Sequence, residues 1–282
     1  MPDCDYIWPE ELIPQVRKEF LILYETECKD MFDEIDVQEV LTDDWWIRRF
    51  LIHNAGDPDL ALDGLINCLK WREEIKIRSI SDRHFPEELY RVGALFQYSV
   101  DQNKVPTLYI RLKLVRRLPA IQDLIKLFIA YNFNAIDTAA HGQGWGLIID
   151  FDGAGIQNAD MDLAKFIVFS LKCYFPSSLS YVFCLDFPWF LRAFWSVVKA
   201  WLPKKRTFAL RFIGRKQLSD YIYPEYLPDF VNGKCKQAYS YVPIGCPRFV
   251  DYCVREMNIP RTTAEKMYTV YKPFLQPEMI RS

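Results

Sequence analysis

Two carboxylates follow an apolar run in the segment LIIDFDG. Asp150 and Asp152 are two residues apart and come directly after a stretch that reads as a buried strand. Carboxylates at this spacing can bind Mg²⁺, and one of them can accept a phosphoryl group as a nucleophile. The pair therefore leaves open a Mg²⁺-dependent phosphatase. The alternative is that both side chains cap and turn the end of the strand, with help from Gly153 and Gly155.

Other catalytic signatures are incomplete. Gly142, Gly144 and Gly146 form a GxGxG pattern. A dinucleotide-binding loop follows a strand and precedes a helix, whereas these glycines follow a predicted helix and precede a predicted strand. No serine lies in the G-x-S-x-G turn that many acyl-transfer enzymes use. We therefore predict a protein that is not an enzyme and has no catalytic residue.

Cysteine and histidine do not cluster along the chain. The eight cysteines include no CxxC pair, and His53, His84 and His141 are far apart in the sequence. A zinc site needs several such ligands close together. Several of the cysteines lie inside apolar runs, where the residue acts as a small hydrophobic side chain. We predict reduced thiols, no metal site and no cofactor.

Composition narrows the class of protein. Half of the 282 residues are apolar and 16% are aromatic, which is enough for a sizeable core. The net charge is −2 and the isoelectric point is near 6.0. This balance argues against nucleic acid as the main partner, because neutralising phosphates requires a basic surface. The start of the chain, MPDCDYIWPEELIPQ, is acidic and has no apolar core of the kind found in secretory signals, so we expect a cytoplasmic protein.

The segment DFPWFLRAFWSVVKAWLPKKR, residues 186–206, is unusually rich in aromatic side chains. A membrane-spanning helix needs roughly 20 apolar residues, but only about 17 lie between Asp186 and Lys204, and Arg192 and Lys199 interrupt them. Two interpretations remain. The helix is either a fully packed core element, or a cover that exchanges protein contacts for lipid contacts and carries a basic rim.

The periodicity of apolar residues changes along the chain. Residues 9–78 read as three short helices, which form a small bundle that must dock on another part of the protein. From about residue 92, apolar strands alternate with helices, which predicts an α/β fold with a largely parallel sheet. After residue 233 we expect one further helix, near Arg248–Met257.

The order of these segments resembles the CRAL-TRIO family of lipid-binding proteins. Six short motifs occur in the family's order between residues 40 and 235: DDWWIRRFL with GLINCLKWREEI, DQNKVP, LIIDFDG, YFP, DFP and EYLP. The runs MDLAKFIVFSLKCYFP and FPWFLRAFWSVVKAWL look most like the N-terminal domain of motile-sperm-domain-containing proteins. The resemblance divides the chain into a helical subdomain (9–78), a lipid-binding domain (84–235) and a C-terminal extension (236–282).

The resemblance implies an apolar pocket on the sheet that holds one lipid and is closed by the aromatic helix of residues 187–202. Such a protein would transfer or present a phospholipid or similar lipid at cytosolic membrane surfaces, including contact sites of the endoplasmic reticulum. The residues expected in the pocket or its gate are Phe187, Phe190, Leu191, Phe194, Val197, Val198, Lys199 and Trp201. Those expected to contact the membrane are Trp189, Phe190, Trp195, Lys204, Lys205 and Arg206. The alternative is an interaction module that keeps the fold but recruits a protein partner or coats a membrane without transferring lipid.

The head group of the lipid is less well defined by the resemblance. Relatives that hold phosphatidylinositol carry a basic pair where this chain has Asn54-Ala55, and an acidic residue where it has Phe166. Lys199 alone matches their phosphate-contacting lysine. The hydroxyl pair of phosphatidylcholine binders falls near Gly155 and Gln157, so that signature is also missing.

Overall fold

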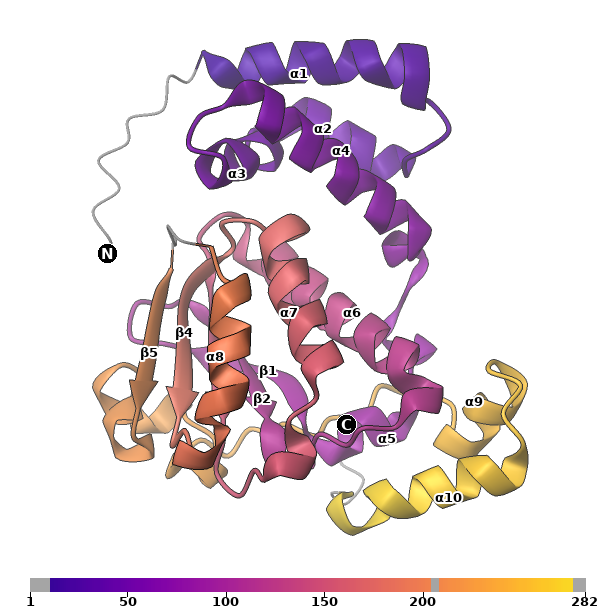
Figure 1. Cartoon of the computed structure of the whole chain (residues 1–282), viewed down its shortest axis with the longest axis vertical. Coiled ribbons are helices and arrows are strands. Elements are labelled where there is room, and N and C mark those ends of the chain that lie inside the picture. The colour runs from indigo at the N-terminus through magenta and orange to yellow at the C-terminus, as the bar shows by residue number, and fades with distance from the viewer. Residues whose placement is uncertain (1–10, 204–207, 276–282) are drawn as a thin grey trace.

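The sheet has five strands, and their order in space follows their order in the chain. The computed structural model describes residues 11–203 and 208–275. β1 pairs with β2 as an antiparallel hairpin, and β2, β3, β4 and β5 then run parallel to one another. This arrangement confirms the predicted mixed, largely parallel sheet (Figure 1). The strands are β1 (Leu95–Val100), β2 (Pro106–Arg111), β3 (Trp145–Asp150), β4 (Leu179–Leu185) and β5 (Ala209–Ile213).

Side chains alternate between the two faces of the sheet, as the two-residue period of a strand requires. Leu147 and Val182 belong to the main core, on the face that packs against helices. Ile148 and Phe183 point to the opposite face, where short 3₁₀ turns between residues 215 and 231 cover them. Figure 1 shows α7 and α8 lying over the sheet. The helices of this part are α5 (Glu87–Val92), α6 (Gln122–Ala140), α7 (Met161–Cys173) and α8 (Arg192–Trp201).

The N-terminal part is helical and has a core of its own. Its described residues, from position 11 onward, form four α-helices, where the sequence predicted three. The helix that we missed is α2, whose apolar stripe is thin and which buries Asp36 against the guanidinium of Arg72 at 2.7 Å. The helix at Pro58 has a side-chain cap, because the Asp57 carboxylate accepts a hydrogen bond from the backbone N–H of Leu60. The helices are α1 (Leu12–Leu23), α2 (Glu34–Thr42), α3 (Trp45–His53) and α4 (Pro58–Glu74).

A small number of side chains hold this helical part on the α/β part. Arg49 of α3 is buried and pairs with Asp137 of α6 at 2.8 Å, and its Nε donates to the carbonyl oxygen of Pro176 at 3.1 Å. Trp71 of α4 stacks on Tyr174, with ring centroids 4.0 Å apart. These contacts fix the end of α3 close to the segment that leads from α7 into β4.

Two helices follow the sheet, α9 (Phe249–Arg255) and α10 (Arg261–Tyr271). The sequence predicted the first but not the second, since only Ala264, Met267 and Tyr271 of α10 are buried and the rest of the helix is polar. Side chains from both helices belong to the same core as the sheet and α6. Among the described residues, no helix is long and apolar enough to cross a membrane.

Candidate functional site

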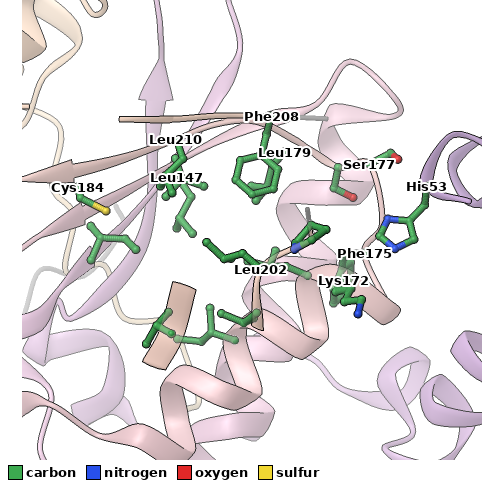
Figure 2. Close-up of a pocket in the computed structure, with 18 of the residues that line it drawn as sticks. His53, Leu147, Lys172, Phe175, Ser177, Leu179, Cys184, Leu202, Phe208 and Leu210 are labelled. Carbon is green, nitrogen blue, oxygen red and sulfur yellow. The ribbon is translucent and has the colours of Figure 1, made fainter. Parts of the chain in front are cut away.

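A cavity of about 400 Å³ lies between the sheet and the helices α7 and α8 (Figure 2). Its size falls within the roughly 300–1,000 Å³ that small-molecule sites occupy. Ile149 lies in the middle strand, yet it is only half-buried because the cavity leaves its side chain accessible. The side chains of β3 and β4 that line the cavity and form its floor are Leu147, Ile149, Leu179, Val182 and Cys184.

Helices form most of the remaining walls of the cavity, together with Phe208 and Leu210 at β5. Val168 and Leu171 of α7 line one side, and Trp195 and Val198 of α8 line another. Leu202, which follows α8 directly, extends the lining. The cavity is therefore apolar over most of its surface, as a site for a hydrocarbon chain must be.

α8 is only lightly attached to the protein. Val198 is the one residue of this helix that is buried, so the interpretation of the aromatic segment as a fully packed core helix is wrong. Around it, Trp195 meets Phe212 of β5 with ring centroids 5.0 Å apart, and Phe212 in turn meets Phe187 at 5.1 Å. The helix thus covers the cavity. Buried Val198 and the edge-to-face contacts of aromatic rings hold it in place.

The residues predicted for the pocket and its gate lie in several environments. Val198 lines the cavity, and Leu191 is buried in the main core just before α8. Phe187 packs on Phe151 and Phe212, at centroid distances of 4.9 and 5.1 Å. Phe194 and Trp201 are half-buried, whereas Phe190, Val197 and Lys199 are exposed. None of these five is among the described residues that line the cavity.

The residues predicted to contact a membrane also differ in where their side chains lie. The Trp189 side chain is 76% exposed and that of Phe190 is 39% exposed, so both rings project into solvent. Trp195 points the other way and lines the cavity. The basic residues 204–206 lie outside the described residues.

One end of the cavity is polar, and sequence reasoning did not identify it. His53 of α3, Lys172 of α7, and Ser177 and Ser178 from the segment before β4 line this end. Burial lowers the pKa of the His53 imidazole, and the nearby Lys172 ammonium lowers it further. His53 directly follows the RRFLI run, and Lys172 lies two positions before the YFP motif. The two residues are 119 positions apart in the sequence, and only the docking of α3 brings them together.

Asp150 and Asp152 are engaged with an arginine. Arg215 pairs with Asp150 at 2.7 Å, with Asp186 at 3.0 Å and with Asp152 at 3.5 Å. Asp150 is fully buried, and burial raises its pKa; its Oδ1 also accepts a hydrogen bond from the backbone N–H of Asp152 at 3.2 Å. These four residues, the Arg215 cluster, turn the end of β3 and tie it to the end of β4. In the described part of the chain, no group of three His, Cys, Asp or Glu residues is placed to hold a metal ion.

Known proteins resemble this chain in sequence, and a solved structure resembles it in fold. A solved structure titled "Crystal structure of Sfh5" superposes with a TM-score of 0.52 at 14% identity, over 92% of this chain and 94% of that one. The Arabidopsis thaliana "Phosphatidylinositol/phosphatidylcholine transfer protein SFH11" is 22% identical over 67% of this chain and 56% of its own length. "Protein real-time" of Drosophila pseudoobscura pseudoobscura is 21% identical over 74% of this chain and 35% of its own length. The chain thus spans between a third and somewhat over half of the length of these two relatives.

A family model settles the classification. The model of the CRAL/TRIO domain matches residues 90–233, which is more than half of the 282 residues. Members of this family typically bind and transfer lipids rather than catalyse reactions. The match spans β1 to β5 and therefore includes every strand that floors or flanks the cavity. The chain belongs to the CRAL/TRIO domain family.

Proposed function

We propose that this chain binds one lipid in the cavity and carries or presents it at a membrane surface, without covalent chemistry. The observation that supports this function is the apolar cavity of about 400 Å³ between the sheet and the lightly held α8. Each methylene group that moves from water into such a site gains about 0.8 kcal/mol, so an acyl chain has a strong preference for it over solvent.

α8 is the element that opens. Moving it away exposes Val198, at a cost of about 1.5–3 kcal/mol for one buried aliphatic side chain, and separates the Trp195 and Phe212 rings. This cost is offset when a lipid enters the cavity, or when the exposed side chains insert into a bilayer, because both keep apolar surface out of water. β3 and β4, by contrast, are paired on both sides and stay in place.

Membrane contact is assigned to the exposed start of the aromatic segment. Trp189, Phe190 and Val197 present apolar side chains to solvent, as amphipathic membrane-surface elements do. Lys199 is exposed on the same helix and contacts phosphates of the bilayer in this scheme. The basic run Lys204-Lys205-Arg206 follows in the sequence, outside the described residues, and adds charge that favours an anionic surface. The protein is then a peripheral one on the cytoplasmic side of membranes. The likeness to motile-sperm-domain-containing proteins favours contact sites of the endoplasmic reticulum.

The second candidate is an interaction module with the same fold, a closed or empty cavity and a protein partner. The exposed Trp189 and Phe190 rings support it, since exposed aromatic residues also mark protein interfaces. Native mass spectrometry of protein purified from eukaryotic cells separates the two functions. A stoichiometric added mass of a lipid is expected; a protein without any such mass under gentle conditions contradicts lipid binding.

Two neighbouring valines provide a matched pair of variants. Val198 lines the cavity, whereas Val197 is 44% exposed. Val198→Trp fills the space with an indole ring and is expected to remove most of the bound lipid mass, while Val197→Trp is expected to keep it. Equal occupancy in both variants would show that the lipid binds elsewhere.

A further inference from the structure

The imidazole, ammonium and hydroxyl groups that line the cavity gather at one end. Figure 2 shows His53, Lys172 and Ser177 gathered on one side, with Cys184 and Leu147 at the opposite side. No acidic side chain is among the described residues that line the cavity. An elongated ligand in the cavity therefore has polar side chains at one of its ends and apolar side chains at the other. Among the described lining residues, no carboxylate at the polar end can pair with a cationic group of the ligand.

Lys172 supplies a positive charge there. It lies in the last turn of α7, is exposed, and forms no ion pair with any residue in the ranges 11–203 and 208–275. Lys126 on the adjacent α6, in contrast, pairs with Asp162 at 2.7 Å. A lysine beside a cavity and without a carboxylate partner is available as the counter-ion of a ligand.

The groups around Lys172 leave its charge uncompensated. The lowered pKa of His53 keeps that imidazole neutral near pH 7, where it offers one N–H donor and one acceptor. Arg49, one turn earlier on α3, is neutralised by Asp137 at 2.8 Å. The Ser177 hydroxyl donates to the carbonyl oxygen of Arg49 at 3.2 Å, and its oxygen can accept a further hydrogen bond. The polar end thus carries a net charge of about one positive unit.

We propose that the lipid bound in the cavity has an anionic oxygen head group, a carboxylate or a phosphate, and that Lys172 with His53 holds it at this end. The tail lies toward Cys184, on the apolar floor. This inference rests on the proposed lipid binding and adds the chemical class of the ligand. A zwitterionic choline head group gains less, since the described lining contains no carboxylate for its ammonium.

The test measures lipid extraction from vesicles of constant charge. The full chain is incubated with phosphatidylcholine vesicles that contain a trace of labelled oleate, labelled phosphatidate or labelled phosphatidylcholine, and the label bound to protein is measured after the vesicles are sedimented. Lys172→Gln removes the charge, and Lys172→Arg keeps it. Lys165→Gln, two turns earlier on the same exposed side of α7, is the matched control.

Wild-type protein is expected to extract an anionic label in preference to phosphatidylcholine. Lys172→Gln is expected to reduce extraction of that label about two- to fivefold, the effect of about one exposed charge pair, with a smaller loss for phosphatidylcholine, whose phosphate is balanced by its own ammonium. Lys172→Arg and Lys165→Gln are expected to retain it. If Lys172→Gln extracts less of both oleate and phosphatidate, the result supports an anionic head group of either kind. If it extracts less of only one of them, the result supports an anionic head group and identifies it as a carboxylate or a phosphate.

Two results overturn the inference in different ways. If Lys172→Gln lowers all three labels equally, or leaves the ratio of anionic to zwitterionic lipid unchanged, the anionic head group is wrong while lipid binding stands. If wild-type protein extracts none of the three labels, the proposed lipid binding is itself overturned.

Discussion

Replacing Arg215 by methionine tests whether the Arg215 cluster holds the strand ends together. The change keeps most of the side-chain volume and removes the guanidinium, so Asp150 loses its ion-pair partner. Asp150 is fully buried, and leaving a buried charge unpaired costs about 3–5 kcal/mol of stability. Asp152 and Asp186 are 53% and 37% exposed in their side chains and add little. Because Arg215 itself retains some solvent contact, we expect the lower end of that range.

Urea denaturation followed by tryptophan fluorescence measures the effect. The free energy of unfolding of Arg215→Met is expected to fall by about 3 kcal/mol at pH 7 with an unchanged dependence on urea. Arg211→Met is the control, since Arg211 is exposed and bonds only to the hydroxyl of Tyr221 at 2.8 Å among the described residues. It should cost less than about 0.5 kcal/mol. A loss no larger than that of Arg211→Met would refute the assignment of the cluster as a buried ion pair.

The pH dependence of the same variant has a defined sign. Burial raises the pKa of Asp150 in the folded protein, and removing Arg215 raises it further. A carboxyl group whose folded pKa is raised holds its proton more tightly in the folded state, so its contribution to stability is present below the unfolded pKa and is lost as the pH rises through the folded pKa. The deficit of Arg215→Met should therefore be smaller at pH 4 than at pH 7. A deficit that grows on acidification would contradict this account.

Two further predictions concern the membrane surface and the sheet. The double change Trp189→Ala with Phe190→Ala should weaken co-sedimentation with phospholipid vesicles by roughly tenfold, because two exposed rings lose their burial in the interface; unchanged co-sedimentation would place these rings outside the membrane contact. Gly146→Ala should lower the free energy of unfolding by about 1–3 kcal/mol, since a Cβ there would lie 2.3 Å from the Tyr181 ring. An unchanged thermal midpoint would mean that the ring moves aside at no cost.

The sheet was predictable because its strands carry strong local signals. Runs such as GLIIDF and SYVFCLDF are apolar on both faces, which is what burial between two layers produces. α2 and α10 were not predicted, since each buries only a few side chains and one of those in α2 is the carboxylate Asp36. Their positions follow from long-range partners such as Arg72, and a local pattern does not contain that information.

The site was predictable in its location but not in its residues. The aromatic segment does cover the cavity, yet a helical wheel does not show which side of an apolar arc meets the protein. Trp195 was therefore assigned to the membrane, although it lines the cavity. The polar end depends on the docking of α3 against the segment before β4, through contacts such as Arg49 to Pro176. No pattern within either segment specifies that contact.

The shared core of the C-terminal helices bears on what a minimal unit of this protein would be. The family model ends at residue 233, but Phe249, Cys253 and Ala264 are fully buried against the same side chains that support the sheet. Cutting the chain at the family boundary would expose that surface to water and leave the helical face of the sheet incomplete. The segment that matches the family model is therefore shorter than the segment that folds as one unit. A chimera that exchanges the lipid-binding part between relatives must include α9 and α10.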